Sequence, residues 1–166
     1  MTGHGRLAVV GNGMAAASLL DNLVRLETGW RITVFGDEPR PAYDRIGLSK
    51  VLAGSRDQAE LELKTPGWYR RNNIEVKTAH RVASLAELEG FDTVVLATGS
   101  LPFVPPIPGA GLDGVMTFRT LDEVQEMIRR AGSGGRAVVI GGGLLGLEAA
   151  RGLLARGMQV SVVHLV

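Results

Sequence analysis

The sequence predicts an α/β protein in which strands and helices alternate and the strands run parallel. Two glycine-rich hexapeptides carry this prediction, GNGMAA at 11–16 and GGGLLG at 141–146, and each directly follows a short apolar run. A helix-forming stretch and a second apolar run come after each hexapeptide, which is the order of a parallel βαβ unit. One such hexapeptide can be merely a tight connection between strand and helix, whereas two with matching flanks indicate two Rossmann-like sheets.

Each hexapeptide is typical of a phosphate-binding turn. Its first glycine permits the turn, its second lets a pyrophosphate approach the backbone, and its third position must be small so that helix and strand can touch. Amide groups at the start of the helix would then hold phosphate oxygens. The residues expected at the phosphates are Gly11, Gly13, Met14 and Ala15 in the first turn, and Gly141, Gly143, Leu145 and Gly146 in the second.

The first predicted unit runs from a strand at 7–10 through a helix at 14–26 to a strand at 32–35. Asp37 and Glu38 follow, roughly 20 residues beyond the turn, where an acid accepts hydrogen bonds from the hydroxyls of an adenosine ribose. Glu38 is the first choice for this role and Asp37 the second. The alternative is that both are solvated acids of a turn.

The next part of the chain is predicted to complete the first sheet. Thr65 and Pro66 have the residue types of a helix N-cap and a first helical position. A proline-rich connection at 101–108 then ends the sheet and begins a crossing into a second domain. The elements expected between these points are a short helix at 46–53, a helix at 66–72, a strand at 74–76, a helical turn at 85–88 and a strand at 91–97.

A second unit begins after this connection. Thr120 and Glu123 form a capping-box pattern for a helix that reaches Arg130. Strands at 137–140 and 159–163 enclose the second hexapeptide and its helix. Without the remaining strands of its sheet, this unit would expose an apolar edge, so the chain is expected to be truncated. The sequence thus predicts a first domain at 1–110 and the incomplete beginning of a second at 111–166.

The composition restricts the function classes. Hydrophobic residues make up 45%, charged residues 21%, and the net charge is +1, so nothing favours nucleic acid or a membrane surface as a partner. The chain has no cysteine, which excludes a disulfide, an iron–sulfur ligand and a redox thiol pair, and we predict no metal site. Electron transfer would therefore require a bound cofactor. A leader and a long apolar run are both lacking, which predicts a cytoplasmic protein, and homo-oligomer formation stays open.

Five segments in order carry a resemblance to a known family: RLAVVGNGMAA, ITVFGDEPRPAYDRIGLSK, VVLATGSLPFVPPIPG, FRTLDEV and AVVIGGGLLGLEAARGL. They resemble the flavoprotein pyridine-nucleotide reductases with two dinucleotide-binding domains, the glutathione-reductase-like fold. Within that family the chain is most similar to the N-terminal part of the large subunit of NAD(P)H-dependent nitrite reductase. The ferredoxin and rubredoxin reductases share the YDR…LSK and ATGS signatures.

The resemblance implies FAD at the first turn, with Glu38 at its ribose, and NADH or NADPH at the second. It assigns catalytic roles to Lys50, against the isoalloxazine ring of FAD, and to Glu148, which would pair with Lys50 across the domain junction. A cation near the ring would offset the negative charge gained on hydride transfer. The other positions that match cofactor contacts of the family are Arg45, Val82, Ala97, Thr98, Gly99 and Arg119.

The chain also departs from the family pattern. Segment 81–92 is shorter than the antiparallel excursion of the family. A later Gly-Asp segment of the FAD domain and any sirohaem and iron–sulfur part are missing, so the chain alone is expected to bind FAD weakly and to be inactive. His164 stands where an acid would select NADH, which leaves NADPH open. We expect Tyr43, Trp30 and Trp68 to pack in the protein rather than to stack on the flavin.

Three functions stay open at this point. The first is the electron-input module of a nitrite reductase, which passes electrons to sirohaem in a downstream redox domain. The second is a reductase that feeds an electron-carrier protein such as a ferredoxin or rubredoxin. The third is a nucleotide-binding module without catalysis. A flavin spectrum that NADH or NADPH bleaches would favour the first two over the third.

Overall fold

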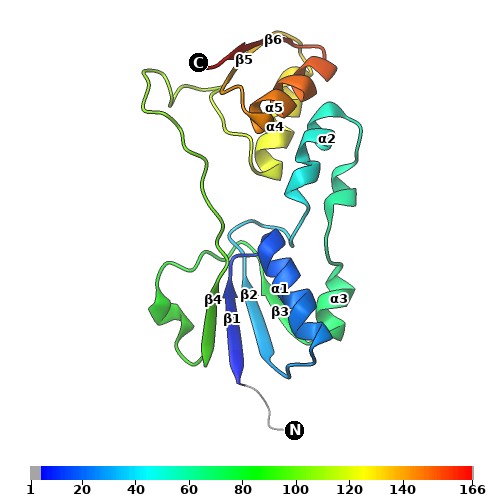
Figure 1. The fold of residues 1–166 in the computed structure, drawn as a ribbon, viewed down its shortest axis with the longest axis vertical. Coiled ribbons are helices and arrows are strands. Elements are labelled where there is room, and N and C mark those ends of the chain that lie inside the picture. The colour runs from blue at the N-terminus through cyan, green and yellow to red at the C-terminus, as the bar shows by residue number, and fades with distance from the viewer. Residues whose placement is uncertain (1–4, 166) are drawn as a thin grey trace. The chain divides into compact units, whose positions relative to one another are not determined.

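The structure is a computed structural model that describes residues 5–165 of the chain. The chain divides into two compact units (Figure 1). The first unit comprises the chain up to Asp44 together with Glu62–Ser100, and the second comprises Arg45–Leu61 together with the chain from Leu101 onward. The segment 45–61 therefore packs with the second unit, although in the sequence it lies between the two segments of the first unit.

The first unit contains a four-stranded parallel sheet in the order β3-β2-β1-β4. Its strands are β1 (Arg6–Val10), β2 (Arg31–Phe35), β3 (Ile74–Lys77) and β4 (Thr93–Leu96). Val10 at the end of β1 is in register with Phe35 of β2 and Leu96 of β4. The residues that follow β1, β2 and β4 consequently meet at one edge of the sheet, the edge where open parallel sheets bind ligands.

Both faces of this sheet are covered. Helices α1 (Met14–Arg25) and α3 (Pro66–Arg71) cover one face, where Ala16 and Leu20 of α1 are fully buried against Val9 and Val34. The opposite face packs Val10 and Phe35 against Leu88, which ends a 3-10 turn at Leu85–Leu88. Figure 1 shows the two helices and this turn on opposite sides of the sheet. The central strands β1 and β2 are buried after their first residues, which explains why they are apolar along most of their length, whereas the edge strands β3 and β4 keep exposed residues.

The second unit repeats the beginning of this arrangement. Strands β5 (Arg136–Ile140) and β6 (Gln159–Val163) pair in parallel, and helix α5 (Leu144–Ala155) connects them. Helices α4 (Leu121–Ala131) and α2 (Leu48–Ala53) pack in the same unit. Within the described residues β5 has one neighbouring strand, and Val138 and Ile140 are 64% and 63% exposed. The apolar edge expected from the sequence is thus present in the structure.

The predicted caps and turns are confirmed, and the predicted strand at 91–97 was too long. Thr65 accepts a hydrogen bond from the backbone N–H of Trp68, and Thr120 and Glu123 form the reciprocal capping box. The residues expected as a single helix at 46–53 begin with a 3-10 turn at Arg45–Gly47 before α2 starts. Hydrogen bonds from Arg129 and Arg130, in the last turn of α4, lower the pKa of Glu126 to about 2, so this carboxylate stays ionised well into the acidic range.

Arg156 ties α5 to α2. Its Nε donates to the carbonyl of Leu52 at 2.7 Å and its Nη2 donates to the carbonyl of Val51 at 3.0 Å. Both carbonyls belong to the last turn of α2, where helical donors run out, and that of Val51 also accepts the N–H of the C-cap residue Gly54 at 3.0 Å. The backbone of α5 also packs closely against the Leu52 side chain of α2, since a Cβ added to Gly152 would lie 2.6 Å from Leu52 Cγ.

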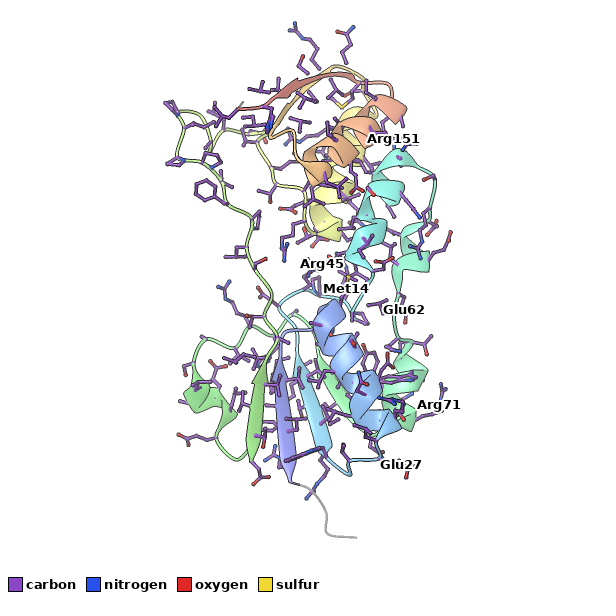
Figure 2. All side chains as sticks on the ribbon, viewed as in Figure 1. Met14, Glu27, Arg45, Glu62, Arg71 and Arg151 are labelled. Atoms are coloured by element: carbon purple, nitrogen blue, oxygen red, sulfur yellow. The ribbon has the colours of Figure 1, made fainter. Side chains whose placement is uncertain are left out.

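We expect Arg156→Met to lower the free energy of unfolding of the second unit by about 1.5–3 kcal/mol, because two charge-assisted hydrogen bonds are lost. Amide hydrogen exchange of α2 and α5 would measure the change. Arg151→Met is the matched control, because Arg151 is exposed on the same helix (Figure 2) and should change stability by less than about 0.5 kcal/mol. Equal effects of the two substitutions would contradict the role of Arg156.

Candidate dinucleotide-binding sites

The first glycine-rich turn is confined by two neighbouring strands. Gly11 has a φ of +107°, and its N–H donates to the carbonyl of Phe35 at 2.8 Å. A Cβ added to Gly11 would lie 2.1 Å from the carbonyl oxygen of Ala97 and 2.8 Å from the nitrogen of Thr98. The turn is therefore closed between the ends of β2 and β4, and only glycine fits there.

The start of α1 is open, in contrast. Gly13 is its N-cap residue and offers no side chain to bond the first amides of the helix. The first helical hydrogen bond runs from the N–H of Ala17 to the carbonyl of Gly13 at 3.0 Å, so the preceding amides lack helical partners. A Cβ added to Gly13 would meet no atom within 4 Å. Figure 2 shows Met14 at this end of α1. Open space before unpaired amides is what an anionic phosphate requires.

Asn12 provides an independent test of whether a ligand fits here. Both polar atoms of its side chain are buried and have no hydrogen-bond partner among the described residues. Asn12 packs against the end of β2, since a Cβ added to Gly36 would lie 2.9 Å from Asn12 Cβ. A buried polar group without a partner costs about 1–3 kcal/mol. A polar ligand at this edge of the sheet would supply such partners, so the site fits a dinucleotide. Asn12 was not among the residues predicted from the sequence, although it lies between two glycines of the motif.

The two acids after β2 differ in their surroundings. The side chain of Asp37 is 68% exposed and lies 3.8 Å from a guanidinium nitrogen of Arg81. Glu38 is partly buried, and its Oε2 accepts a hydrogen bond from the hydroxyl of Tyr43 at 2.7 Å. The structure thus holds Glu38 at the sheet edge and directs Asp37 toward solvent, which favours Glu38 for the ribose. Tyr43 was expected only to pack, and its hydrogen bond is an addition to that interpretation.

The residues after β4 reach the same edge. The N–H of Ala97 donates to the carbonyl of Val10 at 2.7 Å, which brings Ala97 and Thr98 beside Gly11. Gly99 has a φ of +75°, as a turn directly after a strand requires. The residues at 97–99 are therefore grouped at the first turn by the backbone. The side chain of Val82 packs with the core cluster that contains Val10 and Leu88, and its contact with adenine stays a prediction.

The second glycine-rich turn repeats the backbone geometry of the first. Gly141 has a φ of +109°, and its N–H donates to the carbonyl of Val163 at 2.8 Å. A Cβ added to Gly141 would meet nothing within 4 Å, because no described strand lies on that side of β5. Gly143 caps α5 and also faces open space, with Leu145 exposed in the first turn of this helix. A Cβ on Gly146 would lie 1.9 Å from the carbonyl oxygen of Gly141, so this third position must be glycine.

His164 contacts the backbone of the second glycine-rich turn. Its Nδ1 accepts a hydrogen bond from the N–H of Gly142 at 3.2 Å, and a Cβ added to Gly142 would lie 2.9 Å from His164 Cγ. In the first turn the two positions are exchanged. The residue of the turn, Asn12, carries the side chain, and the residue after the second strand, Gly36, is the glycine. Each turn therefore accommodates one side chain between its middle residue and the end of its second strand. The hydrogen bond to His164 was not predicted from the sequence, where His164 stood only in the place of an acid.

The predicted catalytic residues lie on two helices that pack together. Lys50 is exposed on α2 and Glu148 is partly buried on α5. In the part of the chain that the structure describes, no ion pair joins Lys50 to Glu148, so their pairing stays a prediction. Arg45 Nη1 donates to the backbone carbonyl of Arg119 at 3.1 Å, which fixes Arg45 beside the segment before α4. Arg119 thus contributes its backbone to Arg45.

Two features are absent from residues 5–165, a metal site and a membrane-spanning helix. No group of three or more histidine, aspartate or glutamate side chains is arranged to hold a metal ion. None of the described helices has the length and apolar character needed to cross a membrane.

The fold and the two turns define a class, the α/β proteins that bind dinucleotides at the carboxyl edge of parallel sheets. The chain belongs to the pyridine nucleotide-disulphide oxidoreductase family, whose sequence pattern matches residues 5–166. It is 43% identical to the NAD(P)H nitrite reductase of Bacillus subtilis (strain 168) over 98% of the chain. It is 39% identical to the assimilatory nitrate reductase electron transfer subunit of the same organism over 96% of the chain. The chain spans 22% of the length of each of these relatives.

A solved structure confirms the fold. Putidaredoxin reductase in its covalent complex with putidaredoxin matches 97% of the chain with a TM-score of 0.84 and 27% sequence identity, and the match covers 42% of that protein. The predicted α/β fold class, with a Rossmann-like sheet followed by the beginning of another, is thereby confirmed. The predicted resemblance to FAD-dependent pyridine-nucleotide reductases, and to nitrite reductase large subunits among them, is confirmed as well.

Proposed function

We propose that the chain is the dinucleotide-binding part of an oxidoreductase that transfers hydride from NADH or NADPH to FAD and passes electrons onward. The observation that carries this proposal is the repeated geometry of the two turns. Gly11 and Gly141 have φ angles of +107° and +109°, and each donates its N–H to the last residue of the second strand at 2.8 Å. Two matched phosphate sites in one chain support two dinucleotides.

The residues of the first unit would hold FAD in the following way. The amides at the start of α1, from Met14 and Ala15, would bind its pyrophosphate, and Glu38 would accept hydrogen bonds from its ribose. The backbone at 97–99 closes the same edge of the sheet. Bound FAD would supply the hydride-accepting and electron-donating chemistry that the chain's own side chains lack, since the chain has no cysteine.

The second unit would hold the nicotinamide cofactor. The amides at the start of α5 would bind its pyrophosphate, with Gly143 leaving the space open and Gly146 letting the helix approach β5. Lys50 would provide a positive charge near the flavin, and Glu148 would orient it. His164 presents no carboxylate to repel a 2′-phosphate, so both NADH and NADPH are proposed as donors.

Nitrite is the proposed terminal acceptor in the whole protein, through a sirohaem and iron–sulfur part. The support is the 43% identity to an NAD(P)H nitrite reductase. The alternative is an electron-carrier protein, supported by the match to putidaredoxin reductase in complex with putidaredoxin. A third alternative is a module that binds nucleotides without catalysis.

Anaerobic spectroscopy of the whole protein tests the proposal. We expect NADH or NADPH to bleach the absorbance of bound flavin, and we expect nitrite to restore it. Restoration by an added ferredoxin-type carrier, but not by nitrite, would favour the alternative acceptor. Flavin that neither NADH nor NADPH bleaches would contradict the proposed hydride transfer and leave the non-catalytic module.

Lys50→Ala and Glu148→Ala should each slow flavin reduction in the whole protein by about 10-fold or more, equivalent to about 1.4 kcal/mol in the barrier. FAD occupancy should change much less. Stopped-flow absorbance gives the rate, and the ratio of flavin to protein absorbance gives the occupancy. Arg151→Ala, on the exposed surface of α5, is the control and should change neither. Parallel losses of rate and occupancy would show that Lys50 and Glu148 are structural.

A further inference from the structure

Tyr43 is held rigidly in the segment that follows β2. Its side chain is 6% exposed. Its backbone forms an antiparallel bridge with Glu62, and the neighbouring carbonyl of Ala42 accepts a hydrogen bond from the N–H of Leu63 at 3.1 Å. A buried ring on a backbone fixed in this way has little freedom to move its hydroxyl.

The Tyr43 hydroxyl contacts Glu38, one of the two acids that follow β2. It donates to Oε2 of Glu38 at 2.7 Å, a distance typical of a strong bond from a hydroxyl to a carboxylate. The backbone of Glu38 is fixed as well, because its carbonyl accepts the N–H of Ala79 at 2.9 Å. A carboxylate has about four acceptor positions, so Glu38 can bond Tyr43 and still accept hydroxyls of a ligand.

We propose that Tyr43 is a positioning residue for the first dinucleotide site. Its hydroxyl holds the Glu38 carboxylate in the orientation that accepts hydrogen bonds from the two hydroxyls of the adenosine ribose. This inference rests on the proposed function only in that a dinucleotide occupies the first turn. A long glutamate side chain otherwise loses rotamer entropy when it binds a ligand, and the bond from Tyr43 fixes that geometry beforehand. Asp37, exposed beside Arg81, has no such support.

Two ligands that differ only in the ribose separate positioning from a structural role. ADP carries the adenosine ribose hydroxyls, and 2′,3′-dideoxy-ADP lacks both. Tyr43→Phe removes one oxygen and keeps the ring. In the 166-residue chain we expect this substitution to weaken ADP about 5- to 10-fold, and dideoxy-ADP less than about 2-fold. Amide chemical shifts followed by nuclear magnetic resonance during titration give the dissociation constants.

A second substitution tests whether Tyr43 acts through Glu38. Once Glu38→Gln has removed the carboxylate, Tyr43→Phe should change ADP affinity no further. Tyr69→Phe is the matched control, because Tyr69 is the other tyrosine of this unit and is 4% exposed in its core. It should leave the ratio of the two dissociation constants unchanged.

Each remaining outcome contradicts a particular statement. Equal weakening of ADP and dideoxy-ADP by Tyr43→Phe, or no weakening of either, would overturn the positioning role while leaving dinucleotide binding intact. A folded wild-type chain whose amides at 11–16 do not respond to ADP would overturn the proposed function as well. An additional loss caused by Tyr43→Phe in the Glu38→Gln background would show that Tyr43 acts by another route.

Discussion

Gly13→Val should abolish dinucleotide binding at the first site and leave the first unit folded. Because a Cβ at Gly13 meets no atom within 4 Å, the protein accommodates a side chain there without a clash. The same space lies before the unpaired amides of α1, where the phosphates would sit, so the valine side chain would exclude the ligand. We expect ADP affinity to fall by about 100-fold or more, since the phosphate contacts are lost together.

Titration with ADP, followed by amide chemical shifts, measures the change in the Gly13→Val variant. The matched control is Gly143→Val at the same position of the second turn, where a Cβ also meets no atom within 4 Å. That control should lose the nicotinamide cofactor and keep ADP binding at the first turn. Unchanged ADP affinity in Gly13→Val would show that the first turn is not a phosphate site.

Gly11→Ala should unfold the first unit. The added Cβ would lie 2.1 Å from the carbonyl oxygen of Ala97, and the φ of +107° is unfavourable for alanine in any case. Gly11 and the carbonyl of Ala97 both belong to the backbone directly after paired strands, so neither can shift without weakening the sheet. We expect a loss of more than about 3 kcal/mol in the free energy of unfolding, near the upper end for single substitutions.

Gly141→Ala separates the two causes of this loss. Its φ of +109° is nearly the same, yet an added Cβ would meet nothing within 4 Å. The control should therefore lose only the free energy that an unfavourable positive φ costs alanine, about 1–2 kcal/mol. Both tryptophans, Trp30 and Trp68, lie in the first unit, so urea unfolding followed by tryptophan fluorescence measures the Gly11→Ala variant. Amide hydrogen exchange of α5 measures the Gly141→Ala control in the second unit. A Gly11→Ala variant as stable as wild type would contradict the closed geometry of the turn.

The sequence predicted what depends on local chemistry. The two glycine-rich turns, the caps at Thr65 and Thr120 and the parallel pairing of β1 with β2 follow from neighbouring residues and from the right-handed crossover. Such features need no knowledge of distant contacts, and the structure confirms them. The start of β4 was placed less well, because Phe91 and Asp92 precede the paired residues and only the partner strand β1 fixes that pairing begins at Thr93.

Features that depend on distant contacts could not be read in this way. The sequence places 45–61 within the first domain, whereas this segment packs beside α5 through Arg156, which lies more than 100 positions away from Leu52. The bond from Tyr43 to Glu38 depends on the rotamers of two side chains. Each turn also packs one side chain against a glycine, Asn12 against Gly36 in the first and His164 against Gly142 in the second. These contacts join residues that are more than 20 positions apart, so the sequence alone does not show them.

The division of roles between the two turns is the central claim, and amide mapping tests it most directly. Labelled protein is titrated first with ADP, a fragment of FAD, and then with NADPH, the complete nicotinamide cofactor, and the shifted amides are assigned. We predict that one set of shifts centres on 11–16 and a separate set on 141–146, each saturating independently. Shifts confined to one turn, or spread over neither, would contradict the account of two matched phosphate sites.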